Sequence, residues 1–375
     1  MIPLGFERPG DTQAAVVRVA RLAELDADDM AAWTELTETA GADNPFASDY
    51  FTRAVLTHFD PRRHARLFIV ADNDGFWLGV LAAEPAPRFG RMPMPHWRSV
   101  LNANQFVGGP LVRQGREHAF WAVLLPALDE MAAAGTALAL PMLAEEHRVT
   151  RALIEHCAVT GRAAVMTGRI ARAMMRPVQC PVILPPKRRA RLASLERRLA
   201  TDHGPIRYAA VMEGEAERWI AAFLTMEAAG WKGRAGSAVA SRPDSAALFA
   251  DVMQAALATG RAAARTLFAG DRPVAMSAYF LSDGYGLGFK CCYDEEYAAY
   301  APGILLLRDI VGQRATTAAQ WFDSCSAPEE ATINALWPDR RSMIDLCVAT
   351  GSGSDWPFRA AMGARDFWHR LKGGA

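Results

Sequence analysis

The stretch "YAAYAPGILLLRDIVG", residues 297 to 312, places a Pro-Gly pair between a tyrosine-rich segment and an apolar run. Pro302 suits the first position of a helix, because its ring fixes a helical φ and its missing N–H would have no partner inside the helix. The apolar residues Ile304, Leu305, Leu307 and Ile310 recur at helical spacing and predict one buried face. No acidic side chain occupies the first turn, so its free N–H groups predict an anion site.

The composition describes a globular protein with two domains. The chain has 375 residues, with 41 basic and 41 acidic side chains, and this balance argues against a general nucleic-acid binder. Six cysteines occur without a CxxC pair, and the histidines are scattered, so we expect a reducing cytoplasm and no metal. Neither a secretory signal nor an apolar run long enough to cross a membrane is visible.

Both halves of the chain show the same order of elements, namely a hairpin, a third strand, a helix and a fourth strand. The first half predicts helices at 33–40, 48–59 and 118–135, and strands at 64–72, 76–84, 105–112 and 137–143. The second half predicts helices at 216–230 and 303–314, and strands at 261–270, 273–283, 285–294 and 318–326. This repetition predicts an α/β (α+β) fold with two copies of one mixed, mostly antiparallel unit.

A basic segment separates the two halves. We expect an N-terminal domain at 1–184, a basic linker helix at 185–204 and a C-terminal domain at 205–375. The cations of the linker are Lys187, Arg188, Arg189, Arg191, Arg197 and Arg198. They form either the solvated face of a linker helix or a basic wall beside an anionic ligand.

Three motifs in the second half carry a resemblance to a known family. They are "EAAGWKGRAGSA" (227–238), "FKCCYDEEYAAYAPGILL" (289–306) and "FDSCSAPEEATINALWPDRR" (322–341), and "NPFASDYF" and "NQFVGGPLV" in the first half match more loosely. Together they resemble the acetyltransferase branch related to the CelD/BcsL proteins of cellulose biosynthesis, within the GNAT superfamily. Members of that branch are built from two tandem GNAT domains, like the FemABX peptidoglycan aminoacyltransferases.

The resemblance implies an acyl-CoA donor whose pyrophosphate binds at the start of the helix described above. Backbone groups would hold it, and Gly303 would let the backbone approach the phosphates closely. The implied donor-binding residues are Ala301, Pro302, Gly303, Ile304 and Leu305. The sequence departs here from the usual GNAT loop, which is richer in glycine and is preceded by Arg or Gln.

Three residues are candidates for catalysis. Lys290 lies in an apolar strand, where a charge is costly unless it serves a ligand or pairs with a carboxylate. Asp323 could act as a base or anchor the acceptor amine, or it could cap a neighbouring loop from a buried position. Tyr300 is close to the donor segment and could protonate a leaving thiolate, although tyrosines at helical spacing also serve packing.

Two segments are candidates for substrate binding. Trp231, Lys232 and Arg234 stand between glycines in residues 230–236, which we expect to be either a mobile loop over a phosphate or carboxylate, or an ordinary surface turn. The apolar members of the loop 87–99 are Met92, Met94 and Trp97. They could touch a membrane or an acyl chain, or pack into the core.

These observations lead us to expect an acyl-CoA-dependent N-acyltransferase that acts on a primary amine. The acceptor would be a sphingoid-type lipid base, as in ceramide-type N-acylation, or an amino sugar of an envelope polysaccharide. The alternatives are a FemABX-like transferase that uses aminoacyl-tRNA and a non-catalytic GNAT-like partner in envelope synthesis. We expect a cytoplasmic protein without a nucleic-acid partner, with peripheral contact to the inner face of the membrane as an option; the sequence predicts no oligomeric state.

Overall fold

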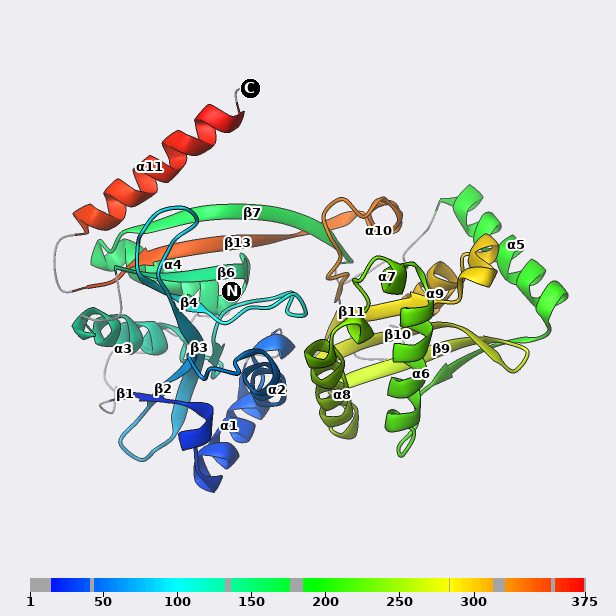
Figure 1. Cartoon of the computed structure of the whole chain (residues 1–375), viewed down its shortest axis with the longest axis horizontal. Helices are drawn as coiled ribbons and strands as arrows, with labels where there is room; N and C mark the ends of the chain where they lie inside the picture. Colours follow the sequence, from blue (N-terminus) through cyan, green and yellow to red (C-terminus); the bar gives the residue numbers. More distant parts are fainter. Residues whose placement is uncertain are drawn as a thin grey trace, which may run out of the picture. The chain divides into compact units, whose positions relative to one another are not determined.

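The computed structural model describes residues 15–40, 44–131, 136–175, 185–282, 284–312, 321–351 and 355–373 (Figure 1). Its contacts divide the chain into two compact units. Unit 1 consists of the described residues within Met1–Thr52, Arg62–Arg169 and Met343–Ala375. Unit 2 consists of those within Arg53–Pro61 and Ile170–Ser342. The strands β7 (Ala164–Met175) and β13 (Asp339–Ala349) therefore contribute residues to both units.

Unit 1 begins with a helical pair and a hairpin. Its helices are α1 (Ala27–Thr39), the start of α2 (Asp49–Phe59), α3 (Glu117–Glu130), α4 (Arg148–Thr160) and α11 (Trp356–Gly373), with short 3-10 turns at Leu22–Glu24 and Pro45–Ala47. Its strands are β1 (Val16–Ala20), β2 (Arg66–Ala71), β3 (Trp77–Ala86), β4 (His96–Ser99), β5 (Leu111–Val112) and β6 (Ala137–Ala144). The hairpin predicted from the strands at 64–72 and 76–84 is formed by β2 and β3, and the Asn-Asp-Gly sequence at residues 73–75 favours the turn between them.

The sheet of unit 1 has the order β1-β2-β3-β4-β6-β13, with β5 added at the edge of β3. Every pairing is antiparallel except the parallel contact of β4 with β6. Side chains alternate between its two faces. Leu138 and Leu140 pack with α3 and α4, whereas Ala137 and Ala139 face the cluster that contains Phe358 of α11. Helices therefore cover both faces of the sheet.

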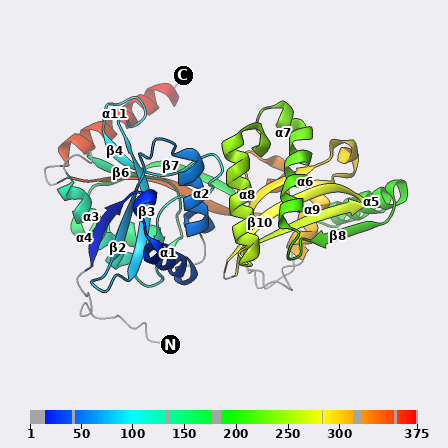
Figure 2. The same cartoon turned by 60° about the horizontal axis from the view of Figure 1, so that its bottom comes forward.

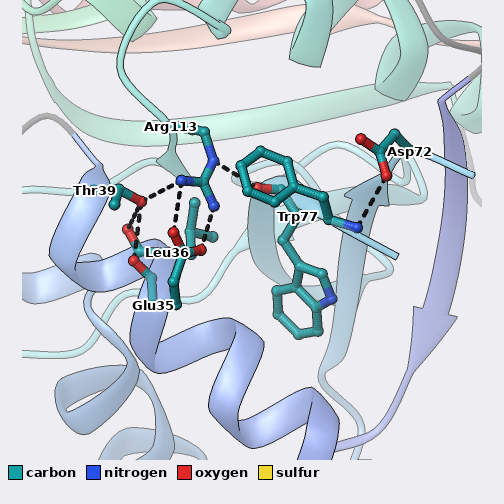
Figure 3. A network of polar contacts seen from close by, with 7 residues as sticks. Glu35, Leu36, Thr39, Asp72, Trp77 and Arg113 are labelled. Carbon is teal, nitrogen blue, oxygen red and sulfur yellow. Dashed lines mark hydrogen bonds and ion pairs between the residues drawn. The ribbon is translucent and has the colours of Figure 1, made fainter. Parts of the chain in front are cut away.

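A polar network fastens α1 to the start of β3 (Figure 3). The Arg113 guanidinium pairs with both carboxylate oxygens of Glu35, and its Nη1 donates to Thr39 Oγ1 at 2.6 Å. Its Nε donates to the carbonyl of Trp77 at 3.1 Å. The hydrogen bond from Arg113 holds the pKa of Glu35 below its usual value. Arg113 is therefore a structural residue that orients α1 on the sheet.

Unit 2 repeats this arrangement. Its helices are α5 (Pro186–His203), α6 (Ala216–Ala229), α7 (Trp231–Arg234), α8 (Pro243–Ala258), α9 (Pro302–Gly312) and α10 (Ala331–Leu336), with 3-10 turns at Val239–Ser241 and η5 (Glu295–Tyr300). Its strands are β8 (Ile206–Ala210), β9 (Ala262–Ala269), β10 (Arg272–Ser282), β11 (Tyr285–Tyr293) and β12 (Trp321–Asp323). They follow the order β12-β11-β10-β9-β8, with the end of β7 beside β12, and only β11 and β12 pair in parallel.

The sheet of unit 2 is also covered on both faces. On one face Phe223 of α6 stacks on Phe249 of α8, with ring centroids 4.9 Å apart, and Phe249 stacks on Phe289 of β11. On the other face, leucines of α5 and α9, such as Leu199 and Leu305, pack with the sheet in one buried cluster. Figure 2 shows α6 and α8, which contact each other, along the sheet. The α/β fold with mixed, mostly antiparallel sheets is thus confirmed.

One expectation about local structure is wrong. Residues 105–112 do not form a strand, because only Leu111–Val112 pairs, and the third strand is instead His96–Ser99, inside the expected loop 87–99. The described residues of Met343–Ala375 group with unit 1, while the domain boundaries at 184 and 205 stay a prediction. This grouping arises because β13 pairs with β6 over Met343↔Ala144 to Ala349↔Ala137. The ends of the elements predicted at 118–135 and 303–314, and the start of the strand at 318–326, lie outside the described residues.

Candidate functional site

The segment quoted first folds as the sequence predicts, into a helix that begins at Pro302. β11 leads into η5, Ala301 follows with a left-handed backbone (φ 52°), and α9 starts at the next residue. The left-handed residue turns the chain sharply, so that α9 packs back against β10 and β11. Leu305, Leu306 and Ile310 are its buried apolar residues, with Leu306 in the place expected for Leu307.

The first turn of α9 has one backbone N–H group, that of Gly303, without a partner among the described residues. The N–H groups of Ile304 and Leu305 both donate to the carbonyl of Ala301, at 3.0 and 3.1 Å. Pro302 has no N–H, and among the described residues no hydrogen-bond partner is found for the N–H of Gly303. Because the first turn holds no acidic side chain, this donor lies at the positive end of the helix dipole.

The space around Gly303 is open. A β-carbon at this position would meet only the ring of Tyr293, at the ordinary contact distance of 3.6 Å. The fold therefore does not require glycine here, whereas a ligand that approaches the backbone would. This makes Gly303 the most informative of the predicted donor-binding residues, which also include Ala301, Pro302, Ile304 and Leu305.

β11 extends beyond its parallel partner. The ladder with β12 runs from Tyr285↔Trp321 to Leu287↔Asp323, where β12 ends, while β11 continues to Tyr293. Residues 290–293 pair with β10 on one edge, and on the other edge no strand pairs with them within the described part of the chain. A substrate could align along this edge next to the start of α9.

Lys290 lies in the part of β11 that extends beyond β12, within a charged cluster. Lys232 of α7 donates from Nζ to Glu227 Oε1 at 3.0 Å and to the carbonyl of Cys291 at 2.6 Å. Glu227, which is 3% exposed, also accepts from the N–H of Val239 at 2.7 Å. Burial lowers the pKa of Lys290 to about 8, and Glu227 offsets this only in part. Lys290 is thus a lysine with a substantial neutral fraction near physiological pH.

The pKa values of the two lysines of this cluster are shifted in opposite directions. Burial alone would lower the pKa of Lys232, but the neighbouring Cys291 and Glu227 outweigh burial and raise it. Lys232 therefore stays protonated and neutralises Glu227. Its charge also disfavours protonation of Lys290. The arrangement can leave Lys290 as a proton acceptor beside a fixed ion pair.

Residues 230–236 form part of the same site, but not as a mobile loop. Trp231–Arg234 is a helical turn, and Glu295 fixes it by accepting from the Trp231 N–H at 2.8 Å and from Arg234 Nη2 at 2.7 Å. The indole of Trp231 is nevertheless 50% exposed. An aromatic surface is thus held in place beside η5, the segment that leads into α9.

Asp323 is placed in a structural network. It is completely buried, and it accepts two hydrogen bonds from Arg172, at 2.8 and 2.6 Å, and one from Arg341 at 2.8 Å. Burial alone would raise the pKa of Asp323, but the two guanidinium groups outweigh burial and hold it below its usual value. Its Oδ1 also accepts from the Cys325 N–H at 2.9 Å, so it caps the following loop. This position favours the loop-capping alternative over that of a base.

Tyr300 is bound to α5. Its hydroxyl donates to Asp202 at 2.7 Å and lies 3.2 Å from His203 Nε2. The hydrogen bond with Asp202 raises the pKa of Tyr300. The three catalytic candidates are therefore not brought together: Lys290, Asp323 and Tyr300 each lie in a different network.

The predicted apolar lining of loop 87–99 is instead part of the core of unit 1. Met94 packs in the cluster with Phe358, with Met92 partly buried against it. Trp97 is in β4 and packs edge-to-face on Phe68, with ring centroids 4.9 Å apart. Of the two alternatives for these residues, packing is the one observed, because β4 forms where a loop was expected.

Unit 1 has no equivalent open edge within its described residues. β4 and β6 pair in parallel only at residues 97–98 and 138–139, but the following loop returns to β6, where the Gly108 N–H donates to the Met142 carbonyl at 2.8 Å. A β-carbon on Gly108 would lie 2.1 Å from the Pro141 carbonyl oxygen, so glycine is needed for this approach. The corresponding helix α3 carries buried Glu117 in its first turn, which opposes anion binding.

The sequence analysis did not identify Glu227 as a site residue, although its place on an apolar helix face indicated a buried ion pair. The buried residues of α6 are Trp219, Ile220, Phe223 and Glu227, which share one helical face. An acidic residue on an apolar face requires a buried partner. That partner, Lys232, was identified, but the pairing depends on the turn at Gly230, which the sequence pattern does not specify.

The comparisons with known proteins agree with this architecture. Residues 186–330, less than half of the chain, match the family described as acetyltransferase (GNAT) domain. This segment contains α9, Gly303 and the charged cluster of β11. The GNAT part of the predicted resemblance is thus confirmed, while the narrower CelD/BcsL assignment stays a prediction. No match was found among curated protein sequences.

Solved structures share the fold across most of the chain. FemX has a TM-score of 0.54 and 10% identity, over 88% of this chain and 98% of its own. A conserved protein of unknown function from Bacteroides thetaiotaomicron has a TM-score of 0.54 and 8% identity, over 86% and 98% of the two chains. L-PGS from Bacillus licheniformis has a TM-score of 0.51 and 11% identity, over 91% and 96%. At such identities the likeness concerns the fold alone, and it supports the tandem GNAT-like arrangement.

The described residues contain neither a membrane-spanning helix nor a cluster of metal-binding side chains. None of their helices is both long and apolar enough to cross a membrane. Within the same residues, no group of three or more His, Cys, Asp or Glu side chains is arranged to hold a metal ion.

Proposed function

We propose that the protein is an N-acyltransferase that moves an acyl group from acyl-CoA to a primary amine in unit 2. The observation that carries this proposal is the start of α9, where the Gly303 N–H has no partner among the described residues and a β-carbon on Gly303 would meet only the ring of Tyr293. A diphosphate fits such a site, because helix N-termini favour anions and Gly303 leaves the backbone accessible. The match of residues 186–330 to an acetyltransferase domain supports the same assignment.

Lys290 is the proposed proton acceptor. An amine arrives mostly protonated at neutral pH and must lose a proton before its lone pair can attack the thioester carbonyl. A neutral Lys290 takes that proton, the new C–N bond forms as the C–S bond breaks, and the thiolate takes the second amine proton. Lys290 then releases its proton to solvent. Burial lowers the pKa of Lys290, and the charge of Lys232 lowers it further, so a neutral fraction is present for the next cycle.

For the acceptor, we propose an amino sugar of an envelope polysaccharide. Trp231 is half exposed, its backbone N–H is held by Glu295, and Glu295 also pairs with Arg234. An amphipathic ring with hydroxyl groups suits such a surface. A sphingoid-type lipid base has less support, because Met94 and Trp97, which were to line its path, are buried in unit 1.

An activity screen tests this proposal. Short and long acyl-CoA donors are crossed with amino sugars and long-chain amines, and the amide product is measured by mass spectrometry. We expect transfer to amino sugars, with the Trp231→Ala variant impaired and the exposed control Trp356→Ala unchanged. Transfer to long-chain amines alone would contradict the proposed acceptor, and no transfer from any acyl-CoA would contradict the proposed donor.

A second candidate is a transferase that uses aminoacyl-tRNA. The observation in its favour is the exposed basic side of α5, which could contact a polyanion. Transfer of an aminoacyl group from charged tRNA without any CoA would establish it. A non-catalytic partner in envelope synthesis would bind neither donor.

A further inference from the structure

α5 carries six lysine and arginine side chains and two acidic ones. Glu196 accepts from Tyr208 at 2.7 Å and pairs with Arg308 at 2.6 Å, and Asp202 accepts from Tyr300. Both acids are thus used within unit 2. Lys187, Arg189, Arg191, Arg197 and Arg198 are all exposed. The helix therefore presents cations to solvent that its own acids do not neutralise.

Three of these cations form one row. Lys187, Arg191 and Arg198 are spaced by 4 and 7 residues, so they lie on the same flank of α5. Among the described residues none of the three forms an ion pair. Lys187 and Arg191 are like charges one turn apart, an arrangement that weakens a helix by a few tenths of a kcal/mol. Helix stability therefore does not explain the row.

Arg198, at one end of the row, lies near the segment that precedes α9. The Arg198 guanidinium lies over the ring of Tyr300, 5.6 Å from its centroid, and Asp202, on the same flank, holds the Tyr300 hydroxyl. Tyr300 precedes Pro302 by two residues. Arg198 is therefore the cation of the row nearest to the site proposed for the donor diphosphate.

We propose that Arg198 and Arg191 bind the 3′-phosphate of the adenosine part of CoA, while its diphosphate lies at Gly303. CoA carries this phosphomonoester on the ribose next to the diphosphate, and its near-double negative charge suits guanidinium groups. The inference rests on the proposed function, because it places the donor at α9. It assigns α5 a part in distinguishing CoA from nucleotides that lack the 3′-phosphate.

The test compares the binding of CoA and of 3′-dephospho-CoA by calorimetry at low ionic strength. The parent protein should bind CoA about five- to tenfold more tightly, the range expected for exposed charge-assisted contacts. In the double variant Arg191→Ala/Arg198→Ala this preference should disappear, while binding of 3′-dephospho-CoA stays unchanged. The control Arg189→Ala, on another flank of α5, should keep the preference.

Each contrary result has a distinct meaning. Equal binding of the two nucleotides by the parent, or a preference that survives in the double variant, would overturn this inference and leave the proposed function standing. Absence of binding to either nucleotide would overturn both. Tight binding of a short RNA that is lost in the double variant, with no preference for CoA, would assign the row to a polynucleotide instead.

Discussion

Replacement of Lys290 by Met should make the protein more stable and inactive. Lys290 is held in an apolar part of β11, where burial lowers its pKa to about 8 from a usual value of 10.5. At pH 7 the folded state must therefore keep a proton on a poorly solvated amine. Methionine has a similar shape and no charge, so Lys290→Met removes this cost together with the proposed proton acceptor.

The size of the effect follows from the difference in pKa. A shift from 10.5 to about 8 corresponds to about 3 kcal/mol at pH 7. Because solvent reaches the half-buried amine, about 1 to 2 kcal/mol is the expected gain in the free energy of unfolding. Between pH 8 and 10.5 the unfolded chain binds the proton and the folded chain does not, so the parent gains stability as pH rises. The advantage of Lys290→Met should vanish by about pH 10.5.

Lys232→Met is the matched control, with the opposite sign. It removes the partner of the buried Glu227 carboxylate and a hydrogen bond to the Cys291 carbonyl, which should cost about 2 to 4 kcal/mol. Urea denaturation of both variants at pH 7 and pH 10 measures these effects. If Lys290→Met lowers stability at pH 7, Lys290 has a favourable structural role and the reasoning about its burial is refuted.

The same pKa predicts the pH dependence of catalysis. The neutral fraction of Lys290 should be about one tenth at pH 7 and about nine tenths at pH 9, so kcat/KM should rise about tenfold over this range. A profile that is flat between pH 7 and pH 9 would exclude Lys290 as the proton acceptor.

Four other variants separate packing from function. Asp323→Asn should destabilise the protein by about 3 to 5 kcal/mol, since it leaves two buried guanidinium groups without their carboxylate; near-normal stability with lost activity in urea denaturation would restore a catalytic role. Gly108→Ala should cost about 2 kcal/mol or more, because its β-carbon would overlap the Pro141 carbonyl, whereas Gly303→Ala should change the unfolding midpoint little. Trp97→Ala should cost about 3 to 5 kcal/mol as a core truncation; an unchanged Tm together with a raised KM only for long-chain amines would show a binding role.

The start of α9 could be predicted because its signals are local. Pro302 fixes a helical φ, and the residues after it carry the apolar period. The element order of both halves was predictable for the same reason. Residues 105–112 were wrongly predicted as a strand because "QFVGGPLV" has the apolar content of one. In the structure, Gly108 and its neighbours pack as an irregular loop against β6.

The remainder depends on tertiary contacts that a single sequence does not encode locally. Lys290 was identified as a costly charge, but its neighbours come from α6 and α7, about sixty residues earlier in the chain. Asp323 was ambiguous because Arg172 and Arg341, which decide its role, lie on other strands. The return of β13 to unit 1 likewise follows from pairing with β6.

Calorimetric titration of CoA into the parent protein and into Gly303→Val tests the central claim most directly. A β-carbon at Gly303 meets only the ring of Tyr293, at 3.6 Å, so the fold has room for a β-carbon here, and the added bulk should obstruct a diphosphate that approaches the backbone. The account predicts that the parent binds one CoA per chain and that Gly303→Val binds it at least about tenfold more weakly at an unchanged Tm. Equal affinity in the two proteins, or no binding of CoA by the parent, would contradict the assignment of α9 as the donor site.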